Sequence, residues 1–102
     1  MIQASDPSQP LLSVLIPAYN EMATIGKLLD RVRKSPVDKE IIVVDDGSTD
    51  GTREWLLAQA ERGDSRFRVL LHEKNQGKSA AVHTAIAAAR GRISLIQDAD
   101  LE

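Results

Sequence analysis

Cysteine is absent from this chain of 102 residues, and aromatic side chains make up only 3% of it. Without cysteine the chain has no disulfide bonds, no thiolate metal sites and no thiol redox chemistry. Its longest apolar runs are about the length of a strand, far short of the roughly 20 residues that span a bilayer. The polar start of the sequence also lacks the apolar centre of a signal peptide. We therefore expect a soluble, cytoplasmic chain.

The chain also lacks a large excess of charge of either sign: it has 13 Lys and Arg and 15 Asp and Glu, which gives a formal net charge of -2. This balance gives no overall attraction to nucleic acid, so no nucleic-acid partner is expected. The length suits one layered α/β domain. The carboxylates are unevenly placed, however, and they cluster at residues 45–50. Such a cluster indicates a cation or a hydroxyl-rich ligand.

The apolar residues of the sequence fall into short, continuous runs. These runs lie at residues 11–16, 41–44, 67–71 and 93–96. Because they do not alternate with polar residues, they predict strands that are covered on both faces, as in a parallel sheet. Residues 1–10 show no periodicity and are predicted to form a flexible tail. The domain is therefore expected to comprise residues 11–102.

Segments between these runs carry helix signals. Apolar residues spaced three and four apart from Met22 to Val32 predict a helix, with Asn20 as its N-cap. Asp50 is predicted to cap a second helix that ends at Gly63. The alanine-rich segment 79–90 predicts a third helix, packed very close to the sheet. The resulting order, β-α-β-α-β-α-β, indicates a doubly wound sheet with ligands at the carboxyl ends of its strands.

Polar residues follow three of the predicted strands. At 17–21 a proline ends the strand ladder, and Tyr19 offers a flat face for a base. In the acidic segment 45–51, we expect Asp46 to contact the ligand. The alternating carboxylates of 97–100 suit a hard cation such as Mg²⁺ or Mn²⁺. Each segment alone also fits an ordinary capped or solvated turn, but together they favour one site.

The strings at 17–21, 43–52 and 98–100 together resemble family 2 glycosyltransferases of GT-A fold, most closely the polyprenyl-phosphate hexosyltransferases. The resemblance implies a Rossmann-like GT-A half-domain with strand order 3-2-1-4. It also implies an inverting transfer of a hexose from a UDP- or GDP-linked sugar, with a polyprenyl phosphate as a candidate acceptor. In the implied site, Pro17, Tyr19, Asn20 and Glu21 line the nucleoside pocket, Val44 adds backbone contacts, Asp46 contacts the base, Asp98 lies near the sugar or diphosphate, and Asp100 is the principal metal ligand.

The sequence departs from that family in several places. Ser79 and Thr84 stand where many relatives have glycine, and Glu102 stands where many of the lipid-phosphate branch have glutamine. The family's acceptor-binding segment and further strands would follow residue 102. We therefore expect this chain to bind donor and metal without turnover and to self-associate through its fourth strand. The full-length protein is then expected at the cytoplasmic face of the membrane.

Two alternatives belong to other classes. A P-loop nucleotide hydrolase is suggested by Gly77, Lys78 and Ser79, but the loop needs a glycine where His72 stands. The other alternative is a binding module that keeps the nucleotide pocket without transferring anything. His72 and His83 are interpreted as surface or packing residues, and Lys78 as a solvated lysine in reach of a diphosphate.

Overall fold

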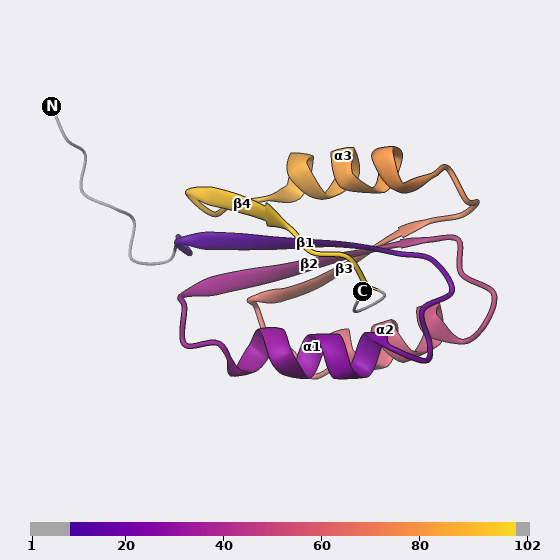
Figure 1. Cartoon of the computed structure of the whole chain (residues 1–102), viewed down its shortest axis with the longest axis horizontal. Coiled ribbons are helices and arrows are strands. Elements are labelled where there is room, and N and C mark those ends of the chain that lie inside the picture. Colours follow the sequence, from indigo (N-terminus) through magenta and orange to yellow (C-terminus); the bar gives the residue numbers. More distant parts are fainter. Residues whose placement is uncertain (1–8, 100–102) are drawn as a thin grey trace, which may run out of the picture.

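The protein forms a four-stranded parallel sheet with helices on both faces, in a computed structural model that describes residues 9–99 (Figure 1). Its elements are β1 (Leu12–Ala18), α1 (Ile25–Lys34), β2 (Lys39–Asp46), α2 (Thr52–Ala60), β3 (Phe67–His72), α3 (Lys78–Ala88) and β4 (Ile93–Ile96). The strand order is β3-β2-β1-β4, and every pair is parallel. The predicted element order and strand order are both confirmed.

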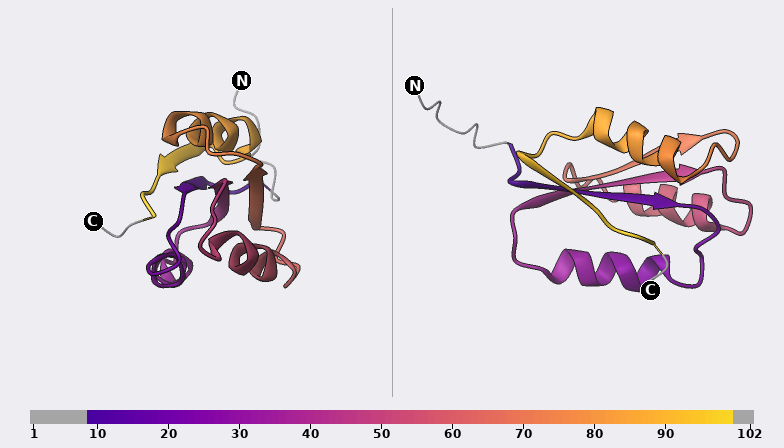
Figure 2. Two further views of the ribbon diagram at one scale, coloured as in Figure 1. Left: turned by 90° about the vertical axis from the view of Figure 1, so that its right-hand side faces the viewer. Right: turned by 45° about the horizontal axis from the view of Figure 1, so that its top comes forward.

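Two apolar layers hold the sheet to its helices. Helices α1 and α2 cover one face, where Ile16, Leu29 and Leu56 are fully buried, and α3 covers the other (Figure 2). Under α3, Ala81 and Ala85 pack on buried side chains of β1 and β2, so this helix lies close to the sheet as predicted. Within residues 9–99, no helix has the length and apolar character needed to cross a membrane.

The start of α1 differs from the prediction that Asn20 caps it. The helix begins at Ile25 after Thr24, and no side chain caps it. Asn20 lies earlier, with a positive φ of 52°, and its side-chain oxygen accepts a hydrogen bond from the backbone N–H of Thr49. An asparagine tolerates this left-handed backbone better than most residues. Asn20 therefore shapes the loop and does not cap the helix.

Asp50 does not occupy the N-cap of α2 as predicted, because it lies one residue before that position. Gly51 occupies the N-cap position, yet the Asp50 carboxylate accepts the backbone N–H of Thr52 at 3.0 Å. Its other oxygen accepts the N–H of Met22 at 3.2 Å. Asp50 thus supplies an acceptor to the first amide of α2 and also joins the loops that follow β1 and β2.

Pro17 does not end the strand ladder as expected, because β1 continues to Ala18 with Pro17 beside Val44 of β2. The proline is tolerated because its backbone nitrogen points toward β4 and not toward β2. The carbonyl of Leu15 accepts the N–H of Gln97, so the backbone N–H and C=O groups of odd-numbered β1 residues point toward β4. Pairing with β4 ends at Leu15, and the missing N–H of Pro17 falls beyond it.

Strand β4 departs from the prediction of coverage on both faces. It lies at the sheet edge, and Ile93, Leu95 and Ile96 are 58%, 50% and 50% exposed. Only β1 pairs with it among the described strands. The apolar run therefore predicted the strand correctly but not its burial.

At the amino-terminal end of the sheet, the carboxylate of Glu40 is buried in a polar cluster. It accepts the Ser13 hydroxyl at 2.6 Å and pairs with the Arg68 guanidinium at 3.0 Å. The backbone N–H groups of Arg90 and Gly91, just after α3, also donate to it. Burial alone raises the pKa of Glu40, but these hydrogen bonds and the charge of Arg68 outweigh it and lower the pKa. The cluster ties the end of α3 to the sheet.

Candidate functional site

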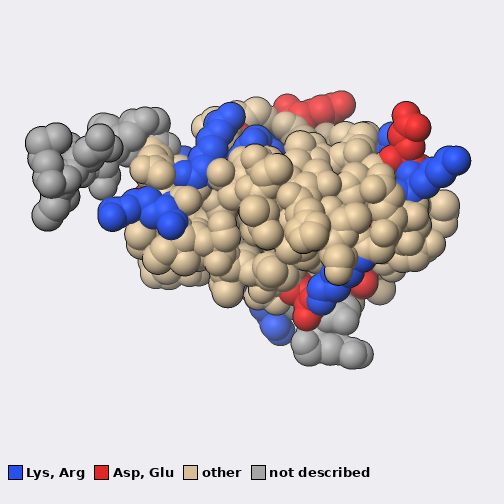
Figure 3. All heavy atoms as spheres, turned by 90° about the horizontal axis from the view of Figure 1, so that it is seen from above, with Lys and Arg blue, Asp and Glu red and all other residues tan. Residues whose placement is uncertain are grey.

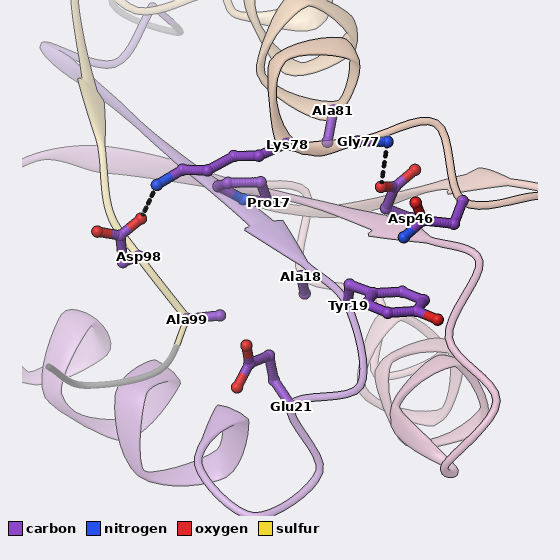
Figure 4. A pocket seen from close by; sticks show the side chains of 11 residues that line it. Pro17, Ala18, Tyr19, Glu21, Asp46, Gly77, Lys78, Ala81, Asp98 and Ala99 are labelled. Carbon is purple, nitrogen blue, oxygen red and sulfur yellow. Dashed lines mark hydrogen bonds and ion pairs between the residues drawn. The ribbon is translucent and has the colours of Figure 1, made fainter.

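A pocket of about 260 Å³ lies across the carboxyl ends of the strands. It is formed by the ends of β1 and β2, the start of α3 and the segment after β4 (Figure 4). Its lining residues are Pro17, Ala18, Tyr19, Glu21, Asp46, Asn75, Gly77, Lys78, Ala81, Asp98 and Ala99. In doubly wound sheets this edge is where ligands bind, at the point where neighbouring strands lead to helices on opposite faces. β1 and β4 meet here with Pro17 and Asp98.

The loops after β1 and β2 are fastened to each other beside this pocket. The backbone N–H of Asn20 donates to the Ser48 hydroxyl at 2.9 Å, and its side chain accepts the Thr49 N–H at 2.8 Å. The N–H of Glu21 donates to the Thr52 hydroxyl at 3.0 Å. These side chains satisfy backbone groups that a loop would otherwise expose. The pocket wall formed by the first loop is therefore held by the second.

Gly47 brings a third loop against the second. Its φ is +80°, and a Cβ built on it would lie 2.6 Å from the backbone nitrogen of Asn75 and 2.8 Å from the carbonyl carbon of Lys74. No side chain fits at such distances, and the left-handed φ also favours glycine. The loop between β3 and α3, which carries the pocket residue Asn75, is therefore seated directly on the loop after β2.

Asp46 is the most densely hydrogen-bonded side chain of the pocket. It is 3% exposed, and its Oδ1 lies 2.8 Å from Nδ1 of His72. The backbone N–H groups of Gln76 and Gly77 donate to its two oxygens, each at 2.9 Å. Burial raises the pKa of Asp46, but these hydrogen bonds prevail and hold the pKa below its ordinary value of 3.8. Asp46 is thus a fixed, ionised acceptor.

The opposite wall carries exposed charges. Lys78, the first residue of α3, reaches across the pocket and pairs with Asp98 just after β4 (Figure 4). The two side chains are 62% and 50% exposed, so both are accessible to a charged ligand. Thr24 donates to the carbonyl of Ala99 at 2.7 Å and so fastens the segment after β4 to the start of α1. Glu21 points toward the same space.

The donor atoms of this wall fit a hard divalent cation. Asp98 and Glu21 supply carboxylate oxygens, the ligand type that Mg²⁺ and Mn²⁺ prefer. Among residues 9–99, no group of three or more His, Cys, Asp or Glu residues is close enough to hold a metal by itself. Asp100, the principal ligand in the sequence prediction, lies outside the described residues. The described part therefore offers part of an oxygen ligand set.

Most of the sequence-predicted site residues come together. Pro17, Tyr19, Glu21, Asp46 and Asp98 all line the pocket. Asn20 and Val44 do not line it: Asn20 bonds to the neighbouring loop, and Val44 is fully buried under α3.

His72, interpreted from the sequence as a surface or packing residue, is buried beside Asp46 at the end of β3. His72 pairs in register with Asp46 across β2 and β3. Since the strand order 3-2-1-4 was expected, the end of β3 beside the end of β2 was the signal that would have found it. Asn75 and Gly77, which follow β3, are pocket residues for the same reason.

The fold and the pocket define a doubly wound α/β domain, with its pocket at the carboxyl ends of the strands where the strand order reverses. The chain belongs to glycosyltransferase family 2, because the model of "Glycosyl transferase family 2" matches residues 13–102. This assignment removes the P-loop alternative.

Relatives and solved structures agree with the family. The chain is 38% identical over 96 residues to undecaprenyl-phosphate 4-deoxy-4-formamido-L-arabinose transferase of Pseudomonas aeruginosa, covering 90% of this chain and 28% of that protein. It resembles a mannosyltransferase from Pyrobaculum calidifontis in complex with GDP-Man and Mn²⁺, with a TM-score of 0.79 and 34% identity over 95% of this chain and 30% of that one.

A third comparison is glucosyl-3-phosphoglycerate synthase from Mycobacterium tuberculosis, in complex with Mn²⁺, UDP and glucosyl-3-phosphoglycerate. The TM-score is 0.67 and the identity 33%, over 88% of this chain and 33% of that one. These solved structures show that the sheet of this chain is that of GT-A glycosyltransferases, as expected. The chain spans roughly a third or less of each protein compared here.

Proposed function

We propose that this chain is the donor-binding part of an inverting glycosyltransferase, which transfers a hexose from a UDP- or GDP-linked sugar to a polyprenyl phosphate. The observation that carries the proposal is one pocket that holds a buried acceptor, Asp46, and an exposed cation and anion, Lys78 and Asp98. The pocket is slightly smaller than the ~300–1,000 Å³ usual for small-molecule sites. It suits part of a sugar nucleotide.

The nucleoside is assigned to the wall formed by Tyr19 and Asp46. The ring of Tyr19 is exposed at the pocket and offers a face on which a base can stack. Ionised Asp46 is an acceptor only. It can therefore accept a hydrogen bond from an N–H of the base, such as the ring N–H of uracil or guanine. This fits the GDP-Man and the UDP bound in the solved relatives.

The diphosphate is assigned to the wall formed by Lys78 and Asp98. Lys78 is in position to exchange its carboxylate partner for a phosphate oxygen, since both side chains are half exposed or more. Asp98 and Asp100 would hold a divalent cation, with Glu21 nearby. Such an ion, when bound, neutralises charge on a leaving diphosphate. The Mn²⁺ in the solved relatives supports this assignment.

The acceptor is assigned by the relatives' chemistry. The Pseudomonas aeruginosa relative is named for transfer to undecaprenyl phosphate. A phosphate acceptor is already ionised near neutral pH and attacks the anomeric carbon without a general base, whereas a hydroxyl acceptor would need one. Single displacement by this oxygen inverts the anomeric centre. We place the full-length enzyme at the cytoplasmic face of the membrane, and we expect residues 1–102 alone to bind donor without turnover.

Calorimetric titration with UDP and GDP, each with and without Mn²⁺, tests the donor site. We expect metal-dependent binding of one of them, lost in Asp100→Ala and retained in the control Asp30→Ala, whose exposed carboxylate pairs with Lys34 on α1. Binding that is equal in Asp100→Ala and wild type would contradict the metal assignment. Absence of binding in every condition, by a chain that unfolds cooperatively, would contradict the assignment of a complete donor site to these residues.

We also propose that the chain self-associates through β4. Its apolar side chains Ile93, Leu95 and Ile96 are half exposed or more, on a sheet edge. Charged side chains leave the middle of the α3 side of the molecule free (Figure 3). Unpaired strand edges of this kind pair readily with a second copy. Light scattering at tens of micromolar should show a dimer that Leu95→Lys dissociates; a wild-type monomer would disprove it.

A further inference from the structure

His72 joins the pocket to the second turn of α3. Its ring is buried, with the residue 7% exposed, and lies between Asp46 and Thr84. Nδ1 is 2.8 Å from Oδ1 of Asp46, and Nε2 is 2.8 Å from the hydroxyl oxygen of Thr84. Both ring nitrogens therefore have a partner, and neither partner is water. A histidine so enclosed has a fixed orientation.

The directions of these hydrogen bonds follow from Asp46. Its carboxylate accepts the N–H groups of Gln76 and Gly77, and an ionised carboxylate has no proton to give. Nδ1 of His72 must therefore be the donor to Asp46. In the neutral ring, Nε2 then has a lone pair and accepts the Thr84 hydroxyl proton. Asp46 thus selects the tautomer with its proton on Nδ1, and the Thr84 hydroxyl donates to the other ring nitrogen.

The network also determines how many acceptor sites Asp46 has left. A carboxylate offers about four lone-pair directions, two on each oxygen. Among the described residues, Oδ1 accepts from His72 and Gln76, whereas Oδ2 accepts from Gly77 alone. Because Asp46 lines the pocket, one further acceptor direction on Oδ2 is left for a ligand. Rotation of the side chain would break the bonds to its protein partners.

We propose that His72 and Thr84 are positioning residues for donor recognition, which hold Asp46 in the orientation that presents Oδ2 to the base. This inference rests on the proposed function, in which Asp46 contacts the base. Gln76 and Gly77 sit between His72 and Lys78 in the chain, so the same network also fixes the start of α3 beside the diphosphate wall. His72 acts on the nucleotide only through Asp46 and this turn.

Three variants separate the two hydrogen bonds of the ring. His72→Asn places an amide nitrogen near the position of Nδ1 and keeps a donor to Asp46. His72→Gln places its amide near Nε2, within reach of Thr84, and leaves Asp46 without that donor. Thr84→Val keeps the volume of the side chain and removes the hydroxyl. A purely structural role would lower thermal stability in all three and leave the affinity of the folded protein unchanged.

The measured quantities are the dissociation constant for UDP or GDP with Mn²⁺, and the hydrogen exchange of the Gln76 and Gly77 amides without nucleotide. We expect His72→Gln to bind about tenfold or more weakly, as for loss of a hydrogen bond to a charged group. His72→Asn should stay within about threefold of wild type, and Thr84→Val should lie between them. The amides should exchange faster in His72→Gln than in His72→Asn.

Equal affinity of the Asn and Gln variants would overturn the proposal, and so would equal amide exchange. If the wild-type chain binds neither nucleotide, the proposed function fails by itself. The exchange measurement then still decides whether His72 positions Asp46 and the turn.

Discussion

Strand β2 carries buried carboxylates at both ends, and two of them, Glu40 and Asp46, have different roles. Glu40 at the amino end and Asp46 at the carboxyl end both lie on the side of the sheet that α3 covers. Each accepts backbone N–H groups from a residue pair that flanks α3, after the helix for Glu40 and before it for Asp46. One strand thus holds both ends of one helix.

The partners of the two carboxylates explain the difference. Glu40 also accepts a hydrogen bond from the Ser13 hydroxyl and pairs with Arg68. It is not among the residues that line the pocket at the carboxyl ends of the strands. Asp46 has His72 instead of an arginine, and it borders the pocket that we assign to the donor. A buried carboxylate therefore bonds only to protein groups at the amino end of the described sheet, whereas at the carboxyl end it keeps an acceptor direction toward the pocket. We expect substitutions at the Glu40 end to change stability alone, and those at the Asp46 end to change binding as well.

The largest effect is expected from Glu40→Ala. The change removes the acceptor of the Arg90 and Gly91 amides and the ion partner of Arg68, which keeps its hydrogen bond to the Ala88 carbonyl. Loss of one partner of a buried ion pair costs about 3–5 kcal/mol. Urea unfolding should show this loss. Asp38→Ala, which removes the more exposed pair with Arg66, should cost less than about 1 kcal/mol. Similar losses of unfolding free energy in both variants would contradict the stabilising role of the buried Glu40 cluster.

A pair of glycine substitutions compares the two ends directly. A Cβ at Gly91 would lie 2.5 Å from the Ser13 hydroxyl oxygen and 2.6 Å from the Ser13 nitrogen, and one at Gly47 would lie 2.6 Å from the nitrogen of Asn75. Each alanine variant should lose about 1–3 kcal/mol of unfolding free energy through overpacking.

Nucleotide titration then distinguishes these variants, provided that wild type binds. Gly47→Ala should weaken binding severalfold, because it displaces the loop that carries Asn75, whereas Gly91→Ala should bind as wild type when folded. The control Gly63→Ala has a positive φ of 78° but no atom within 4 Å, so it isolates the backbone cost. Equal affinities of the Gly47 and Gly91 variants would contradict the separation of the two ends.

Acid should weaken both carboxylate clusters, with a smaller effect than deletion. In the folded chain the pKa of Glu40 is below its ordinary 4.5 and that of Asp46 below 3.8. A lowered folded-state pKa gives stability that is fully present above the ordinary value and is lost as the pH falls through the folded-state pKa. The urea concentration at the unfolding midpoint should therefore decrease as the pH is lowered below 4.5. In Glu40→Gln the first part of this decrease should be smaller than in wild type. An unchanged profile in Glu40→Gln would contradict this contribution.

The sequence predicted the elements of both ends but not their side-chain partners. Continuous apolar runs and helical spacing depend on local chemistry, so the order of elements followed from them. The partnership of Asp46 with His72 depends on strand register, which apolar runs do not specify. Asn20 was misplaced because a polar residue before a helix resembles a cap whether its side chain turns to the helix or to the next loop. The metal ligand Asp100 remains a prediction from the motif alone.

The smallest effect on stability is expected at the exposed ion pair of the pocket. Lys78 and Asp98 are 62% and 50% exposed, and exposed pairs contribute about 0–1 kcal/mol. Lys78→Met, which keeps most of the side-chain length, should therefore leave urea unfolding almost unchanged. Yet it should weaken nucleoside diphosphate binding severalfold and nucleoside binding hardly at all, because only the phosphates meet this residue in our assignment. If uridine and UDP lose affinity equally, Lys78 acts on the shape of the pocket and not on the diphosphate. A loss confined to the diphosphate would show that the exposed charges at the carboxyl end of the sheet serve binding and contribute little to stability. The amino end, in contrast, depends for its stability on the buried charge of Glu40.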